Sequence, residues 1–259
     1  MILVTGATGL VGSRLMFDLV SSGKRVRVLL RSGSNRSRID KMFADSPGLL
    51  SSSVEWAEGD VLDVLSLKEA MRGVKEVFHC AGLVSFQPGE ADRLLEVNID
   101  GTANVVNMAL ESGVEHLVHV SSIAALGRNA DGESIDESAT WKTSKRNSAY
   151  AISKYSAERE VWRGIAEGLK AAIVNPGVII GPGNWKTDSS MIFGQVNRGL
   201  SFYTRGISGF VDVRDVSKAM IMLSEKRISG ERYVLVSENK PFREVFDLIS
   251  DKLGKKRPS

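Results

Sequence analysis

The sequence predicts an α/β fold in which helices cover both faces of a doubly wound parallel sheet. Three observations lead to this prediction. Strand-like and helix-like segments alternate along most of the chain. A glycine-rich turn directly follows the first apolar run. The chain has 259 residues, 42% of them apolar, which is enough to build one large core.

The alternation can be followed element by element. Short apolar runs predict strands at residues 1–5, 25–30, 54–57, 76–80, 116–120 and 171–174. Helical spacing of apolar residues predicts helices at 10–22, 63–72, 90–112 and 148–168, and residues 232–254 predict a strand and then a helix. Irregular loops are expected at 32–53, 123–147 and 181–209, which are rich in Gly, Ser, Asn and charge. Short parallel strands joined by helical crossovers are typical of a Rossmann-type sheet.

Composition excludes several classes of protein. The chain carries 34 Lys and Arg against 31 Asp and Glu, so no polybasic surface is expected and nucleic acid is not the predicted partner. The single cysteine, Cys80, excludes an internal disulfide framework and suits a reducing compartment. No apolar run is long enough to cross a bilayer, and the first strand leaves no room for a signal peptide. We therefore expect a cytoplasmic protein.

The first glycine-rich turn predicts a phosphate-binding site. Gly6, Gly9 and Gly12 lie between the first strand and its helix in the spacing G-x-x-G-x-x-G. Glycine lets the backbone turn tightly and approach a pyrophosphate, while the helix N-terminus offers N–H groups and the positive end of its dipole. Because both the strand and the helix are present, the turn predicts a dinucleotide cofactor.

The end of the second predicted strand bears on which dinucleotide is bound. In such folds the residue at this position contacts the adenosine ribose. An acidic residue there suits NAD, and an arginine suits the 2′-phosphate of NADP. Here the position is Arg31, followed by Ser32 and, a little further on, Arg36 and Arg38. The sequence favours NADP and leaves NAD open.

Two side chains on the predicted helix 148–168 point to acid/base chemistry. Tyr150 and Lys154 are four residues apart and so share one helix face. Tyrosine ordinarily ionises near about pH 10, but a neighbouring ammonium favours the phenolate. Ser121 and Ser122 follow the fifth strand, whose carboxyl end faces the ligand crevice in this kind of sheet. One of these hydroxyls could stabilise charge on a substrate oxygen, and we assign a local backbone role to Ser121.

The whole set of motifs resembles the extended short-chain dehydrogenase/reductase family. The resemblance covers nearly the whole chain and rests on TGATGLVG (5–12), GDVLD (59–63), HCAG (79–82), VNIDGT (97–102), VSSIAALG (120–127), YAISK (150–154), NPGVIIGPG (175–183) and FVDVRDVSKA (210–219). It implies a catalytic set of Ser122, Tyr150 and Lys154, with no metal. It also implies that Asn98 supports the active-site helix.

The same resemblance implies a set of cofactor contacts. Lys154 would hold the nicotinamide ribose beside Tyr150. The other implied contacts are Gly6, Thr8, Gly9, Leu10, Val11 and Gly12 at the pyrophosphate, Arg31, Asp60 and Val61 at the adenosine end, and Ala81, Gly82, Pro176 and Val178 along the nicotinamide half. We expect a dinucleotide-binding domain over residues 1–175, followed by a small substrate-facing part over 176–259 that is shortened for the family and interleaved with the last sheet elements.

Within the family, the sequence is most similar to the branch that includes dihydroflavonol reductases and hopanoid-associated sugar epimerases. Asn175, Ile180 and Leu126 stand where nucleotide-sugar enzymes usually carry Arg, Tyr and Tyr. The resemblance implies reduction of a carbonyl on a small-molecule substrate with NADPH. Two alternatives stay open: an NAD-dependent sugar or nucleotide-sugar epimerase or dehydratase, and a dinucleotide-sensing protein without catalysis. A homodimer through the helices at 90–112 and 148–168 also stays open.

Overall fold

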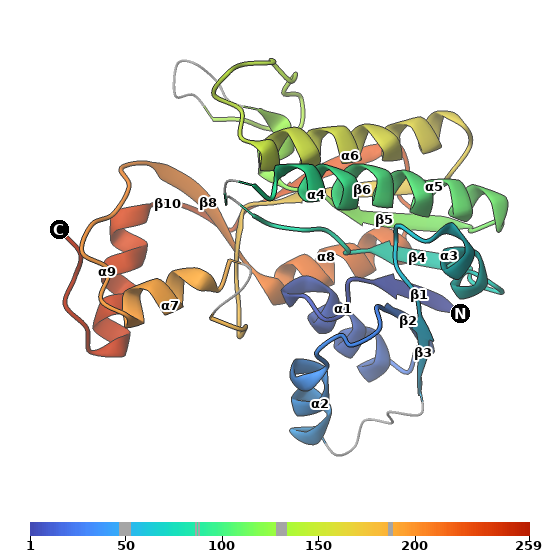
Figure 1. The fold of residues 1–259 in the computed structure, drawn as a ribbon, viewed down its shortest axis with the longest axis horizontal. Helices are drawn as coiled ribbons and strands as arrows, with labels where there is room; N and C mark the ends of the chain where they lie inside the picture. Colours follow the sequence, from blue (N-terminus) through green and yellow to red (C-terminus); the bar gives the residue numbers. More distant parts are fainter. Residues whose placement is uncertain (47–52, 86, 88, 128–133, 186–188) are drawn as a thin grey trace.

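A seven-stranded parallel sheet forms the centre of the molecule. The computed structural model describes residues 1–46, 53–85, 87, 89–127, 134–185 and 189–259. The strand order is β3-β2-β1-β4-β5-β6-β9, and every neighbouring pair is parallel (Figure 1). The strands are β1 (Ile2–Thr5), β2 (Val26–Leu30), β3 (Val54–Glu58), β4 (Glu76–His79), β5 (His116–Val120), β6 (Ala171–Pro176) and β9 (Glu231–Leu235). The predicted fold class is confirmed.

Two apolar layers hold helices on opposite faces of this sheet. Successive strand residues point to opposite faces, so Val118 joins the layer under α1 (Leu10–Ser21) and α8 (Val213–Glu225). Its neighbour Leu117 joins the other layer, under α3 (Val64–Ala70), α5 (Gly101–Glu111) and α6 (Ala149–Ala166). Burial on both faces explains why the strands read as continuous apolar runs rather than alternating ones.

The predicted helix at 90–112 is three elements. It begins as α4 (Ala91–Leu95), widens into one π-helical segment (Glu96–Asp100) and continues as α5. Such π segments interrupt the regular hydrogen-bond ladder and are frequent at functional sites. Helical periodicity cannot reveal this interruption, because the apolar spacing changes by only one residue.

Two of the three expected loops contain helices. Residues 32–53 include α2 (Ser37–Ala44), and residues 181–209 include α7 (Met191–Asn197); the third stretch begins with a 3₁₀ turn (Ile123–Leu126). The α2 helix has only eight residues, so its apolar stripe of Ile39, Met42 and Phe43 is too short to mark a helix clearly in the sequence. The segments at 47–52, 128–133 and 186–188 lie outside the described residues.

A second, smaller unit leaves the principal sheet at the carboxyl end of β6. It consists of the three-stranded sheet β10-β8-β7 together with α7 and α9 (Phe242–Leu253). Its strands are β7 (Val178–Ile180), β8 (Ile207–Asp212) and β10 (Glu238–Pro241), and Val196, Phe246 and Ile249 form its own core. Figure 1 shows this unit at the left, beside the principal sheet. Between these elements the chain returns to the main body as α8 and β9.

No described helix has both the length and the apolar character needed to cross a bilayer.

Candidate active site

The glycine turn after β1 is held by two close backbone approaches. Gly6 has φ +69°, and a Cβ on it would lie 2.5 Å from the backbone nitrogen of Ala81. A Cβ on Gly12 would lie 2.3 Å from the carbonyl oxygen of Gly6. Any side chain at either position would displace backbone, so the fold itself requires these two glycines.

The middle glycine has a different environment. A Cβ on Gly9 would meet only the carbonyl oxygen of Gly6, at 3.3 Å, and its φ of −75° is open to any residue. Gly9 caps α1, whose first N–H groups lack intrahelical partners and lie at the positive end of the helix dipole. Leu10 and Val11 bury their side chains, and Thr8 is half-buried on the turn. The backbone here fits a pyrophosphate, with Gly9 leaving the room for it.

The residues predicted for the adenosine end surround the carboxyl ends of β2 and β3. Arg31 is exposed, and its guanidinium makes no hydrogen bond or ion pair with the described residues. Arg36 stacks over the Trp56 ring at 3.7 Å from the centroid. The Asp60 carboxylate accepts a hydrogen bond from the Leu62 N–H at 3.0 Å. Arg31 is therefore an unengaged cation directly after β2, at the position that the sequence predicts for the adenosine ribose.

Val61 is placed by its surroundings. Its side chain is buried, and its carbonyl accepts a hydrogen bond from the Asn104 amide at 3.1 Å. The side chain lies 2.8 Å from where a Cβ on Gly101 would be. The start of α5 therefore fixes the loop that follows β3.

The structure brings Ser122 and Tyr150 together at the carboxyl end of β5. Ser122 begins the 3₁₀ turn by accepting a hydrogen bond from the Ala124 N–H at 3.1 Å. Burial raises the pKa of Tyr150 above its ordinary value, and a side-chain hydrogen bond with Ser122 opposes that rise. The phenol is therefore neutral at physiological pH and already paired with the hydroxyl predicted to share its task.

Lys154 lies one helical turn further along α6. Its ammonium donates a hydrogen bond to the Val120 carbonyl at 2.8 Å and lies 3.9 Å from where a Cβ on Gly82 would be. Burial lowers the pKa of Lys154 to about 8, against the opposing effect of Glu158 and Cys80. The group remains cationic at neutral pH, next to the backbone that follows β4.

Other ionisable groups around Lys154 are held in their neutral forms. Burial, helped by the Lys154 charge, lowers the pKa of His79 to about 3, and it lowers that of His119 well below the ordinary value. The His79 ring shares hydrogen bonds with Thr5 at 2.8 Å and Thr102 at 3.0 Å. Burial raises the pKa of the Cys80 thiol to about 12. None of these three side chains supplies or accepts a proton near pH 7. Tyr150 and Lys154 therefore remain as the candidate acid/base groups.

Asn98 connects the π-helical segment to the site. Its Oδ1 accepts from the Leu83 N–H at 2.7 Å, and its Nδ2 donates to the Leu83 carbonyl at 3.0 Å and to the Ser153 hydroxyl at 2.9 Å. Because Ser153 immediately precedes Lys154, this amide ties the loop after β4 to the helix that carries the candidate catalytic pair.

Glu158 completes the site and was not predicted from the sequence. Its buried carboxylate accepts hydrogen bonds from Ser121 at 2.7 Å and Asn175 at 2.7 Å, and it pairs with Arg232 at 3.1 Å. Asn175 also donates to the Ser122 carbonyl at 3.0 Å. Glu158 thus joins α6 to the carboxyl ends of β5 and β6 and to Arg232 near the start of β9. Its spacing of eight residues from Tyr150 on one helix face was a usable signal, whereas nothing in the sequence marks Arg232 as its partner.

The remaining predicted contacts lie where the two sheets meet. Pro176 is buried at the end of β6, and Val178 is half-buried at the start of β7. Between them, a Cβ on Gly177 would lie 2.3 Å from the carbonyl oxygen of Gly209. This close approach aims the chain from the principal sheet into the smaller one.

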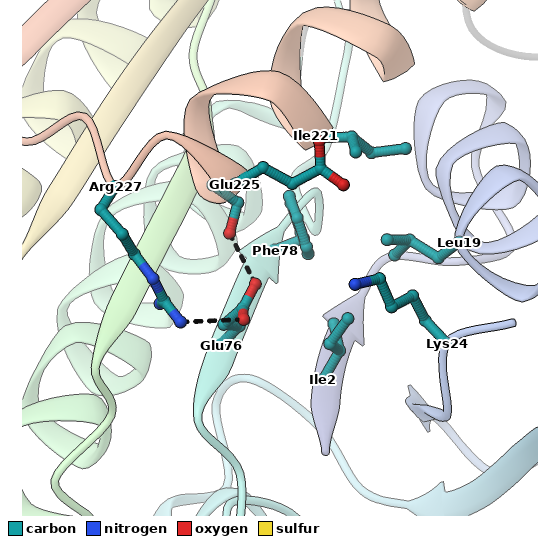
Figure 2. A pocket seen from close by; sticks show the side chains of 9 residues that line it. Ile2, Leu19, Lys24, Glu76, Phe78, Ile221, Glu225 and Arg227 are labelled. Carbon is teal, nitrogen blue, oxygen red and sulfur yellow. Dashed lines mark hydrogen bonds and ion pairs between the residues drawn. The ribbon is translucent and has the colours of Figure 1, made fainter. Parts of the chain in front are cut away.

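Two pockets lie at opposite edges of the principal sheet. One, of about 260 Å³, borders Tyr150. The other, of about 240 Å³, lies at the amino ends of β1 and β4, where Glu76 pairs with Arg227 (Figure 2). We place the candidate active site at the first, because in parallel α/β sheets the ligand crevice lies at the carboxyl ends. The described residues contain no cluster of three or more His, Cys, Asp or Glu able to hold a metal.

Comparisons with known proteins relate this chain to a family and to several of its members. The model of the NAD-dependent epimerase/dehydratase family matches residues 2–235. Sterol demethylase protein B of Methylococcus capsulatus is 31% identical over 258 residues, covering 99% of this chain and 75% of that protein. A putative dihydroflavonol 4-reductase of Synechocystis is 31% identical over 261 residues, covering 98% and 73%. The crystal structure of gox2253 has a TM-score of 0.89 at 35% identity, covering 100% of this chain and 76% of that one.

Proposed function

Since this chain belongs to the NAD-dependent epimerase/dehydratase family, we propose that it reduces a carbonyl group of a small molecule with NADPH. The observation that carries the proposal is the hydrogen bond between Tyr150 and Ser122 at the edge of a pocket, one helical turn from the buried ammonium of Lys154. The likeness to a protein named as a putative dihydroflavonol 4-reductase favours reduction over epimerisation.

In this proposal each side chain has one task. Tyr150 donates its proton to the substrate oxygen as negative charge develops there. Ser122 donates a hydrogen bond to the same oxygen and so stabilises that charge. The Lys154 ammonium lowers the energy of the phenolate that remains, and Asn98 and Glu158 hold the elements that carry these groups. The bound cofactor supplies the hydride.

We further propose how the cofactor is held. The backbone at Gly6, Gly9 and Gly12 takes the pyrophosphate, and the unengaged Arg31 guanidinium takes the 2′-phosphate, which makes NADPH preferred over NADH. Lys154 binds the nicotinamide ribose in addition to its catalytic task. We also propose a cytoplasmic homodimer that does not bind nucleic acid, and analytical ultracentrifugation would test the assembly.

The test is Tyr150→Phe, measured as NADPH oxidation across a panel of aldehydes and ketones. The substitution removes only the hydroxyl, so folding and NADPH affinity should hold while kcat falls by about 10²- to 10⁴-fold. The control is Tyr155→Phe, on the same helix, where the ring stacks on Trp141 at 4.3 Å away from the pair. A Tyr150→Phe enzyme that keeps more than about half of wild-type turnover with chemistry rate-limiting would overturn the proposal.

A further inference from the structure

The pocket beside Tyr150 carries one charge. It is lined by nine described residues: Ser85, Gln87, Gly89, Glu90, Ala91, Leu94, Ser148, Ala149 and Tyr150. Glu90 is the only acidic or basic side chain among these nine apart from the Tyr150 phenol, whose pKa burial raises. Ala91, Leu94 and Ala149 supply apolar wall. At about 260 Å³ the pocket is slightly smaller than the common range of roughly 300 to 1,000 Å³, so it suits a small ligand.

The Glu90 carboxylate does not make the helix-capping hydrogen bond that its position in the chain suggests. Glu90 is the N-cap residue of α4, yet its side chain makes no capping hydrogen bond. The Ser85 hydroxyl donates to Glu90 instead. The Ser85 oxygen also accepts a hydrogen bond from the Gln87 N–H at 3.1 Å, which holds the hydroxyl in place. Ser85 and Glu90 both line the pocket, so this hydrogen-bonded pair is part of the pocket wall.

Glu90 also keeps unused bonding capacity. A carboxylate can accept about four hydrogen bonds and donates none, and Ser85 takes one of them. Among the described residues, no Lys, Arg or His pairs with Glu90. The Ser148 hydroxyl accepts from the Ala151 N–H at 3.2 Å as the cap of α6 and makes no hydrogen bond with Glu90. An acceptor-only, negatively charged group thus lies in the same pocket as the candidate proton donor.

We propose that Glu90 selects the substrate, which is a neutral carbonyl compound with a hydroxyl group at the end remote from the carbonyl. The proposal rests on the proposed function, because Tyr150 would hold the carbonyl oxygen while Glu90 accepts the hydrogen bond of the hydroxyl. The apolar wall packs on the carbon skeleton between them. A carboxylate or phosphate at the remote end is rejected, because it would bring a second negative charge against Glu90 with no proton to share.

Two aldehydes of nearly the same shape test this choice. 4-(Hydroxymethyl)benzaldehyde has the neutral hydroxyl, and 4-carboxybenzaldehyde has an anion in its place. Binding of each to the NADPH-loaded protein is measured by calorimetry, and KM and kcat are measured where turnover occurs. We expect the wild type to bind the hydroxyl compound about ten- to a hundredfold more tightly, the range for a hydrogen bond to a charged group.

Glu90→Gln removes the charge and keeps the shape of the side chain. It should lower the preference by at least about tenfold, mainly through stronger binding of 4-carboxybenzaldehyde. Asp92→Asn removes a charge of the same sign from the exposed part of α4 and should leave the preference unchanged. Ser85→Ala offers a second test if Glu90→Gln folds poorly, because it leaves the charge in place and should preserve rejection of the anion.

The outcomes separate the two proposals. A wild type that binds the aldehydes equally, or binds neither, overturns the role of Glu90, and so does a Glu90→Gln variant with an unchanged preference. If the hydroxyl compound binds selectively through Glu90 but no hydride is transferred to any carbonyl, the role of Glu90 stands and the proposed reductase function fails.

Discussion

The polar side chains at the two edges of the principal sheet differ in their hydrogen-bond and ion-pair partners. At the amino edge, Glu76 accepts from Ser224 at 2.7 Å and pairs with Arg227 at 3.2 Å (Figure 2). At the carboxyl edge, Lys154 is buried against a carbonyl. His119 is fully buried there, and its ring nitrogens have no hydrogen-bond partner among the described residues.

This difference distinguishes a structural surface from a reactive one. Exposed pairs at the amino edge contribute little free energy, because water screens them and competes for each partner. At the carboxyl edge, burial lowers the pKa of Lys154 to about 8 and raises that of Tyr150. Both pockets have similar volumes, and the shifted pKa values of Tyr150 and Lys154 support our placement of the candidate active site at the carboxyl edge.

The largest effect on stability is expected at Glu158. Glu158→Ala removes the buried carboxylate that pairs with Arg232 and accepts from Ser121 and Asn175, although Asn175 keeps the Ser122 carbonyl and Arg232 keeps two backbone carbonyls. Breaking such a pair typically costs about 3 to 5 kcal/mol, so urea unfolding should show a loss of that size. Glu160→Ala, on the same helix in a surface pair with Arg163, should cost less than about 1 kcal/mol.

The same variant should also change a pH profile. The Glu158 carboxylate raises the pKa of Lys154, so its removal moves that pKa below about 8. The ammonium is then lost at lower pH, and the alkaline limb of the kcat profile should shift toward acid. An unshifted limb in a folded Glu158→Ala enzyme would assign Glu158 a purely structural role.

The next largest effect is expected on cofactor affinity at Gly9. Gly9→Val places a branched side chain where the phosphates approach, while its Cβ meets the fold only at the Gly6 carbonyl oxygen, at 3.3 Å, a milder contact than the one at Gly12. We expect NADPH affinity to fall by at least about a hundredfold, near 2.8 kcal/mol, with little change in unfolding. Gly12→Ala should do the reverse and lower stability, because its Cβ would lie 2.3 Å from the Gly6 carbonyl oxygen. Unchanged NADPH binding by Gly9→Val in calorimetry would contradict the phosphate site.

A smaller effect is expected at Arg31. Its exposed guanidinium has no partner among the described residues, so Arg31→Ala should leave the free protein as stable as before. A charge-assisted contact to the 2′-phosphate contributes about 1.5 to 3 kcal/mol, so NADPH binding should weaken by that amount while NADH binding does not. Equal weakening of both cofactors, or a wild type that prefers NADH, would refute the preference for NADP.

The sequence predicted the principal sheet better than the smaller unit. Residues such as Val4 and Val118 lie in strands buried on both faces, which leave continuous apolar runs in the sequence. The strands of the smaller unit contain exposed or polar residues such as Ile207 and Asn239, and they pair with segments far away in the chain. Local pattern carries little information about such pairing.

The candidate site likewise has one part that the sequence predicted and another that it did not. Tyr150 and Lys154 could be linked from helical spacing alone. The contacts of Lys154 with Val120 and of Glu158 with Arg232 join residues 34 and 74 positions apart, and no local spacing encodes them. Likewise, Glu90 reads as an ordinary helix start until the structure shows its side chain bonded to Ser85 rather than to the helix.

The smallest effect is expected at the amino edge, at Arg227. This residue has φ +52°, in the left-handed region that costs a non-glycine residue about 1 kcal/mol or more. Arg227→Gly relieves that strain and loses the half-exposed pair with Glu76, so the free energy of unfolding should change by less than about 1 kcal/mol. Arg227→Ala loses the pair and keeps the strain, so it should be the less stable of the two. Both should retain wild-type kcat and NADPH affinity, because the charges they alter lie at the opposite end of the strands from Tyr150. A marked loss of turnover in Arg227→Gly would show that the amino edge takes part in function after all.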